Sequence, residues 1–149
     1  MSAVTRVYAG RLIGLQVRGP DLDPIGRVRD VVVTIRPQGQ QSRALGVVVE
    51  LVSRRRIFVR MGRIAAIEPG DITLASGSVS MRAFQVRSGE LTVMGDLVGA
   101  KVHTDDPELS HLHGRAVEIA DVELERVRTR DWVITKVAVF GSRPKFGRS

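Results

Sequence analysis

The sequence contains no cysteine among its 149 residues. This absence excludes disulfide scaffolds, thiolate zinc sites, iron–sulfur clusters and cysteine nucleophiles, and it is typical of a protein from the reducing cytoplasm. Aromatic residues are also scarce, at 4% of the chain, and Trp132 is the single tryptophan. The longest apolar run, Ala44 to Val49, is far shorter than the ~20 residues that cross a bilayer, so we expect no membrane insertion.

What the chain has instead is a high content of β-branched side chains. Hydrophobic residues make up 43% of it, which is enough to form a folded core. Val, Ile and Thr together clearly outnumber Ala and Leu, the residues that favour helices. Because β-branched side chains fit a pleated surface better than a helix, the composition predicts an all-β fold.

The positive charge is concentrated in the first half of the chain. The formal net charge is +7, and residues 1–85 carry all of this excess. The densest basic cluster is predicted to be an interaction surface. Its partner would be an acidic protein, or else nucleic acid or anionic lipid; the other alternative is a solvated face without a partner. The cluster consists of Arg54, Arg55, Arg56, Arg60 and Arg63. Only Phe58 lies among these arginines to stack on a base.

A strand pattern occurs twice. The segment Gly10 to Val17 is echoed by Gly95 to Val102, with four identical positions at one constant offset. Farther along, the triplet beginning at Gly26 aligns with the triplet beginning at Gly114, after a three-residue insertion. Each copy is interpreted as strand, turn, strand, loop, strand.

The repeat predicts two small barrels in tandem. Residues 1–80 form the first unit, 81–89 a linker with a short helix, 90–140 the second unit and 141–149 a polar tail. The second unit lacks counterparts of the closing strands that the first places in residues 57–74. We therefore expect it to be completed by other elements, by a second copy of the chain, or by residues of a longer polypeptide. Its open edge is predicted in Trp132 to Phe140, with Trp132 as an interaction residue.

At this point the residues resemble a known family. The pattern Leu12-Ile-Gly14…Gly26-Arg27-Val28, followed by Arg56-Ile-Phe-Val59, resembles the PRC-barrel. That small β-barrel occurs in the photosynthetic reaction-centre H subunit and in the ribosome maturation factor RimM. With two copies, the chain is similar to the N-terminal region of actinobacterial proteins that continue into an MgtE-type N domain and a CBS pair. Magnesium transport enters only through this resemblance. Arg60, where the pattern leads us to expect proline, departs from it.

Motifs for catalysis are scarce. The glycines lack the lysine and hydroxyl of a phosphate-binding loop and the third glycine of a dinucleotide fingerprint. A polar loop holds the histidines, and its two alternatives are a divalent-metal site and a simple solvated loop. The candidate ligands are His103, Asp105, Asp106, His111 and His113. No Ser-His-acid arrangement follows from the spacing, so we expect no enzyme and no cofactor.

The leading hypothesis is a non-catalytic interaction or scaffold module. It would be cytoplasmic, at the inner face of the membrane through a partner, and the resemblance associates it with magnesium transport. A protein partner or a homodimer is expected. The rival hypothesis is an RNA-associated ribosome-assembly protein of the RimM type, which the basic first half favours. An enzyme or a metal-dependent sensor using the histidine loop is a third alternative.

Overall fold

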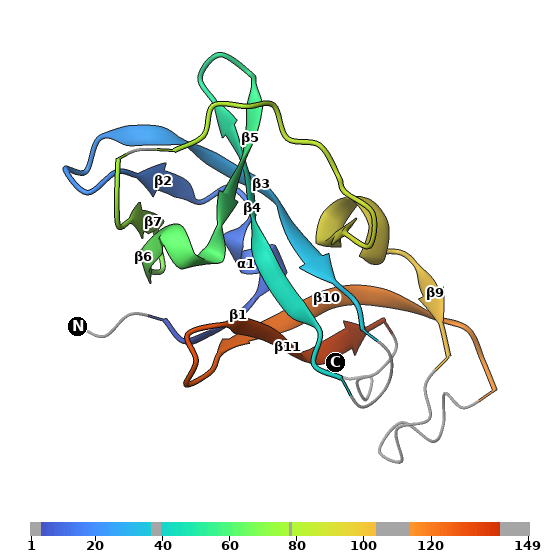
Figure 1. Cartoon of the computed structure of the whole chain (residues 1–149). Coiled ribbons are helices and arrows are strands. Elements are labelled where there is room, and N and C mark those ends of the chain that lie inside the picture. The colour runs from blue at the N-terminus through green and yellow to red at the C-terminus, as the bar shows by residue number, and fades with distance from the viewer. Residues whose placement is uncertain (1–3, 37–39, 78, 104–113, 141–149) are drawn as a thin grey trace.

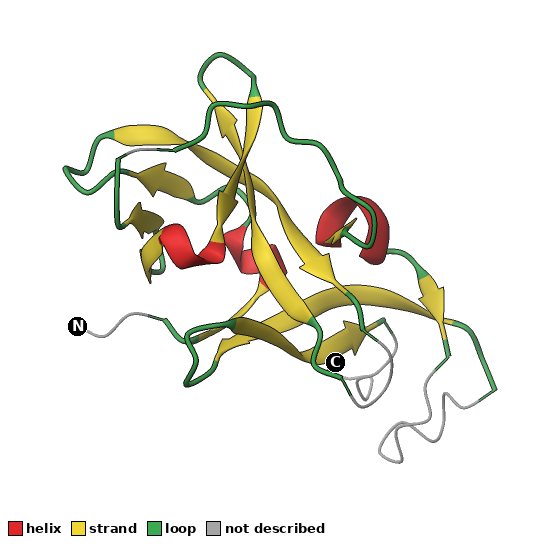
Figure 2. Cartoon of the chain, viewed as in Figure 1, coloured by secondary structure: helices red, strands yellow, loops and turns green. Residues whose placement is uncertain are grey.

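The computed structural model describes residues 4–36, 40–77, 79–103 and 114–140. Strands dominate these residues, and the helical segments are single short turns, so the predicted all-β fold is confirmed (Figure 2). Within the described residues no helix is long and apolar enough to span a membrane. The elements are β1 (Arg6–Tyr8), α1 (Ala9–Leu12), β2 (Gln16–Arg18), β3 (Pro24–Thr34), β4 (Arg43–Leu51), β5 (Arg56–Arg60), η1 (Met61–Arg63), β6 (Ile64–Ile67), β7 (Asp71–Leu74), β8 (Leu91–Thr92), η2 (Val93–Leu97), β9 (Lys101–Val102), β10 (Val117–Arg126) and β11 (Trp132–Val139).

The strands of both sequence units belong to one continuous sheet. Its order is β1-β10-β11-β4-β3-β2-β7-β6, with β5 paired to β4, β8 to β3 and β9 to β10. Two long hairpins, β3–β4 and β10–β11, form its centre (Figure 1). They meet where Trp132 pairs with Ala44 and Val133 with Arg43.

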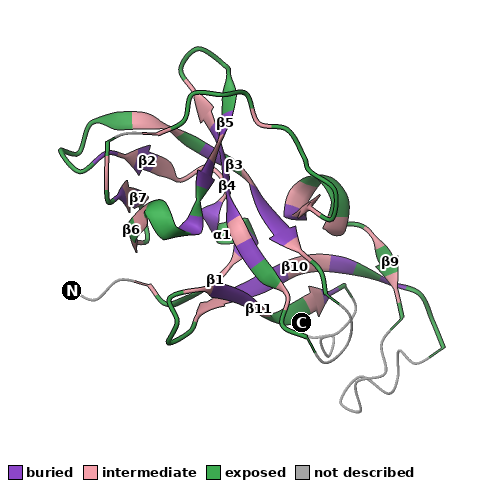
Figure 3. Ribbon diagram, in the orientation of Figure 1, coloured by how far each residue is buried: buried purple, intermediate pink, exposed green. Residues whose placement is uncertain are grey.

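The two units expected from the repeat do not form separate barrels, because they exchange strands within one sheet. The first strand of each unit pairs with the long hairpin of the other: β1 lies beside β10, and β8 lies beside β3. The physical reason is that a strand edge exposes backbone donors and acceptors, and the first strand of the other unit pairs with them. One large buried cluster combines side chains of both units, among them Leu12, Val31 and Leu124. Buried stretches lie along the strands of both long hairpins (Figure 3).

The repeat itself is present in the backbone. Gly14 and Gly99 adopt φ angles of 88° and 89°, in the left-handed region that glycine tolerates best. Gly14 N donates to Val28 O at 2.8 Å, and Gly99 N donates to Ile119 O at the same distance. The turn after the first strand thus docks on the long hairpin in the same way in both units.

The sequence alignment of the later strands is wrong. Because Val28 and Ile119 accept equivalent hydrogen bonds, Gly26 corresponds to Val117 and not to Gly114. The stretch from Gly99 to Ile119 exceeds the stretch from Gly14 to Val28 by twice the predicted insertion. The match of the Gly26 triplet to the Gly114 triplet is a local identity outside the equivalent strands.

Two aspartates fasten each unit to the other. Asp30 on β3 accepts hydrogen bonds from Met94 N at 2.8 Å and Gly95 N at 3.1 Å, at the start of η2. Asp121 on β10 accepts one from Gly10 N at 3.0 Å, in α1. The first amides of a helical turn have no partner within the turn, so each carboxylate supplies acceptors that the other unit lacks.

The predicted helical linker is also corrected. Residues 81–89 contain no helix but pass over β5 as an extended strap. Phe84 N donates to Arg56 O at 2.7 Å, and the Phe84 and Phe58 rings stack with centroids 6.1 Å apart. These two contacts hold the strap on β5 in an extended conformation.

We predict that Asp30→Ala destabilises the fold by about 3 kcal/mol, because it removes a charged acceptor from backbone amides of the other unit. Urea unfolding measures the change. Asp23→Ala is the matched control, since Asp23 is exposed in the β2–β3 turn, and its stability should stay within about 0.5 kcal/mol of the parent. Equal stabilities for the two variants would contradict the role given to Asp30.

Candidate functional site

The five predicted interaction arginines do not form one patch. Arg55 Nη1 donates to Met81 O at 3.0 Å, and Arg56 Nε bonds to Glu50 at 3.1 Å. Arg60 and Arg63 lie at the opposite end of β5, across η1. Strand alternation explains part of this separation, because alternate residues of β5 face the core: Ile57 and Val59 are buried, and Arg56 and Arg60 are exposed.

Arg54 instead joins arginines from β3. With Arg27 and Arg29 it lines an open hollow of about 340 Å³ beside the β4–β5 turn. The sequence could not show this grouping, because it depends on the register that places Arg27 opposite Glu50. Arg27 Nη1 donates to Gly14 O at 3.0 Å, so part of this positive charge holds the fold together.

Glu50 is the acid at the centre of these arginines. Its side chain is 15% exposed and lies 3.1 Å from Arg56 Nε and 3.6 Å from Arg29 Nη2. The hydrogen bond from Arg56 lowers the pKa of Glu50 most, the positive charge of Arg29 lowers it further, and burial opposes both. In the folded protein Glu50 therefore stays ionised at a lower pH than an ordinary glutamate does.

The two aromatic residues named from the sequence are both covered. Trp132 begins β11 and is 5% exposed within the shared core. Phe58 stacks on Phe84, so its ring is not a free platform for a base. Of the candidate metal ligands, His103 is exposed just after β9, and the other four lie outside the described residues. Among the residues that are described, no three His, Asp or Glu side chains are grouped to hold a metal ion.

The edge of β11 differs from the equivalent edge of β4. β4 is covered by β5, which pairs with Gly46 through Glu50. Superposing the hairpins through their bulges makes Val47 equivalent to Val137 and Val49 equivalent to Val139. Val47 and Val49 are fully buried, whereas Val137 is 48% exposed; Val139 is 8% exposed. Within the described residues, β11 meets β4 only at Trp132 and Val133.

Among the described residues, the backbone groups at the second half of this edge have no partner strand. Phe140 N donates to the backbone O of Glu118 in β10, so the N–H of Phe140 points toward β10. Because alternate residues of a strand point their N–H and C=O groups to opposite sides, those of Val137 and Val139 point away from β10. The edge predicted from the sequence in Trp132 to Phe140 is closed at its start, because β4 pairs with Trp132 and Val133, while Ile134 N donates to Ser42 O and Ile134 O accepts from Gln41 Nε2. Among the described residues, its second half has no such partner.

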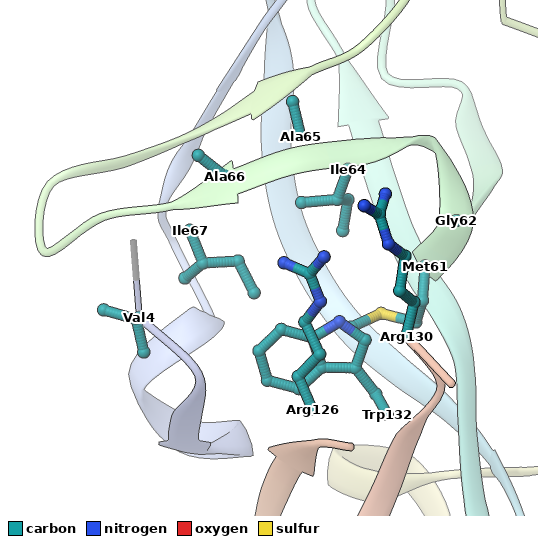
Figure 4. Close-up of a pocket in the computed structure, with 10 residues that line it drawn as sticks. All are labelled: Val4, Met61, Gly62, Ile64, Ala65, Ala66, Ile67, Arg126, Arg130 and Trp132. Atoms are coloured by element: carbon teal, nitrogen blue, oxygen red, sulfur yellow. The ribbon is translucent and has the colours of Figure 1, made fainter. Parts of the chain in front are cut away.

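Sequence reasoning missed two arginines beside Trp132. Arg126 ends β10, and Arg130 lies in the β10–β11 turn; both line a cleft above the tryptophan (Figure 4). No motif marks them. Only the pairing of Arg126 with Trp132 across the hairpin, together with the packing of β6 opposite, brings them together.

Comparison with known proteins gives one family. The model of the actinomycetes SH3 domain matches residues 91–149. The chain is similar to that family over less than half of its length, and the matched range contains β8 through β11 but not β1, which pairs with β10. No curated protein matches the chain.

We predict that Glu50→Gln flattens the acid side of the stability curve. A carboxylate whose folded pKa is depressed adds stability above its unfolded pKa, near 4.5, and loses that contribution as the pH falls through the lower folded value. Urea unfolding between pH 2.5 and 6 should therefore fall less steeply for the variant. Glu68→Gln is the control and should follow the parent, because Glu68 is half-buried at the start of the β6–β7 turn and has no ion pair among those found in the described residues. A parent-like slope for Glu50→Gln would contradict the assignment.

Proposed function

We propose that this protein is a non-catalytic interaction module that binds a β-strand of a protein partner at the free edge of β11. The observation that carries the proposal is the difference between equivalent hairpins: β4 is covered by β5, and the same stretch of β11 is open among the described residues. Backbone pairing at an open edge supplies affinity, and the alternate side chains supply specificity. Similarity to the actinomycetes SH3 domain over residues 91–149 supports an interaction role.

The covered edge of β4 indicates what an occupant of β11 needs. Ile57 and Val59 of β5 pair with Val49 and Val47 and point into the core, so β-branched residues belong at these two positions. A partner strand should repeat this alternation opposite Val139 and Val137.

The open edge of β11 and the covered edge of β4 differ at two equivalent positions. Lys136 lies at the position equivalent to Gly46, where an added Cβ would collide with the backbone O of Val59 and lie 2.6 Å from the Phe58 ring. The occupant must therefore lie farther from β11 at this point than β5 lies from β4, and an aromatic residue like Phe58 does not fit there. Phe140, which is 58% exposed, lies at the position equivalent to Glu50. The occupant should therefore place an acidic residue opposite Lys136 and an apolar residue opposite Phe140.

A blocked peptide, Leu-Ile-Thr-Val-Glu, tests this design. Antiparallel to β11, it places Leu opposite Phe140 and Glu opposite Lys136, with Ile and Val in the roles of Ile57 and Val59. We expect saturable binding, with backbone amide shifts at Val137 and Val139 in NMR spectra. Val137→Pro removes one edge donor and should abolish binding while the fold is retained, because proline is tolerated at strand edges.

Two controls sharpen this experiment. The peptide with Ile and Val replaced by Asp should not bind, and Val52→Pro, in the fully exposed β4–β5 turn, should bind as the parent does. Light scattering over a concentration range shows whether a second copy of the chain occupies the edge, in which case Val137→Pro should also abolish dimers. No binding of the peptide and no self-association would refute the proposal.

The RNA-associated alternative stays a prediction, for which the hollow lined by Arg27, Arg29 and Arg54 is the candidate surface. If RNA binds there, its affinity should fall steeply with salt, because arginine–phosphate contacts release counterions. Titration of single-stranded and structured RNA at low salt compares the parent with Arg54→Glu/Arg56→Glu. Equally negligible binding by both would remove this alternative. Association with magnesium transport likewise rests on the PRC-barrel resemblance.

A further inference from the structure

A small cleft opens between two parts of the chain that are distant in sequence. η1 and β6 form one wall, and the end of β10 with its turn to β11 forms the other (Figure 4). The cleft has a volume of about 80 Å³. Its floor and apolar wall come from Val4, Met61, Ile64, Ile67 and Trp132. It lies at the end of β11 that β4 covers, away from the open edge at Val137 and Val139.

Two positive charges face this apolar space. The side chains of Arg126 and Arg130 rise above Trp132 toward β6 (Figure 4). No carboxylate is among the described residues that line the cleft, and the ion pairs found in the described part of the chain involve neither arginine. A pair of guanidinium groups without a countercharge attracts an anion, and its fork-like donors match the two oxygens of a carboxylate.

The backbone holds Arg130 in an unfavourable conformation. Its φ angle is 72°, in the left-handed region where glycine or asparagine fits with less strain than arginine. The turn is closed by Val127 N donating to Asp131 O at 2.9 Å and Arg130 N donating to Val127 O at 2.8 Å. An arginine at this position lowers the stability of the turn, but it places a guanidinium group over the cleft.

We propose that this cleft binds the carboxylate of an acidic side chain presented by a partner peptide. A water molecule occupies about 30 Å³ in the liquid, so the cleft admits a carboxylate with its short apolar stem. The methylenes would contact Ile64 and Trp132, and the oxygens would accept hydrogen bonds from Arg126 and Arg130. A nucleobase does not fit, because Trp132 is only 5% exposed and offers no open ring face for stacking.

The test uses the complete chain and a blocked tripeptide, acetyl-Leu-Glu-Leu-amide, with acetyl-Leu-Gln-Leu-amide as the uncharged control. Two readouts are followed: the fluorescence of the single tryptophan, Trp132, and the NMR signals of the arginine Nε–H groups. We expect saturable binding of the Glu peptide that weakens with salt, with shifts at Arg126 and Arg130. The Gln peptide should bind at least tenfold more weakly.

Three variants locate the site. Arg126→Gln and Arg130→Asn should each weaken the Glu peptide at least tenfold. Asparagine tolerates the left-handed conformation, so Arg130→Asn should keep or raise the thermal midpoint, which separates loss of binding from loss of folding. Arg128→Gln is the matched control, because Arg128 is exposed in the same turn and does not line the cleft; it should bind as the parent does.

Other results would overturn the proposal. Equal binding of the Glu and Gln peptides would show that charge is not recognised, and parent-like binding by Arg126→Gln and Arg130→Asn would place the site elsewhere. Absence of any change in both readouts would mean that the cleft does not bind carboxylates. Binding of a single-stranded RNA 12-mer at these arginines, without binding of the acidic peptide, would assign the cleft to nucleic acid instead.

Discussion

The fold depends on an exchange of hydrogen bonds between its two halves. Asp30 accepts the first amides of η2, and Asp121 accepts an amide of α1, so each half supplies the carboxylate that the other requires. Each aspartate also accepts a hydrogen bond from the next residue of its own strand, Val31 or Val122. Anchored in this way, the carboxylates hold the helical turns against the long hairpins, and the turns bring β1 and β8 to the hairpin edges. The described strands within the range that matches the actinomycetes SH3 domain, β8 to β11, are thus interleaved with strands of the first half of the chain.

The two long hairpins are nearly equivalent, so the positions at which they differ show how their edges differ. The bulges that interrupt β3–β4 recur at equivalent places in β10–β11, so the two hairpins share their register. The covering strand differs: β5 lies on β4, and its close approach requires Gly46, where a Cβ would collide with Val59 O. Lys136 stands at the equivalent place on β11. The second hairpin therefore has a side chain that a strand packed like β5 could not tolerate, so a partner strand should approach β11 less closely at Lys136 than β5 approaches β4.

Much of the local structure could be predicted from the sequence. The β-branched content and the glycines at positions 14 and 99 indicate strands and tight turns, because these features act over a few residues. The exchange of β1 and β8 could not be predicted, since the same alternating pattern suits a strand in either half. Aligning Gly26 with Gly114 failed for a related reason: local identity carries no information on hydrogen-bond register. The helix expected in residues 81–89 lost to the contacts of Phe84 with β5.

The candidate sites were less predictable than the fold, because they depend on residues brought together across the sheet. A run such as Arg54-Arg55-Arg56 attracts notice, yet two of these side chains bond to Met81 and Glu50. Arg126 and Arg130 belong to no motif and gather over Trp132 only through the hairpin and β6. Arg54 and Arg130 share a left-handed backbone, with φ angles of 74° and 72°, at equivalent places in turns closed by the same pair of hydrogen bonds. Each also lines a surface hollow. A turn that prefers glycine has an arginine at both places, so the geometry that costs stability also projects a cation over a concave surface. Both positions thus combine a strained backbone with an exposed cation, and this combination is what the proposed carboxylate site uses at Arg130.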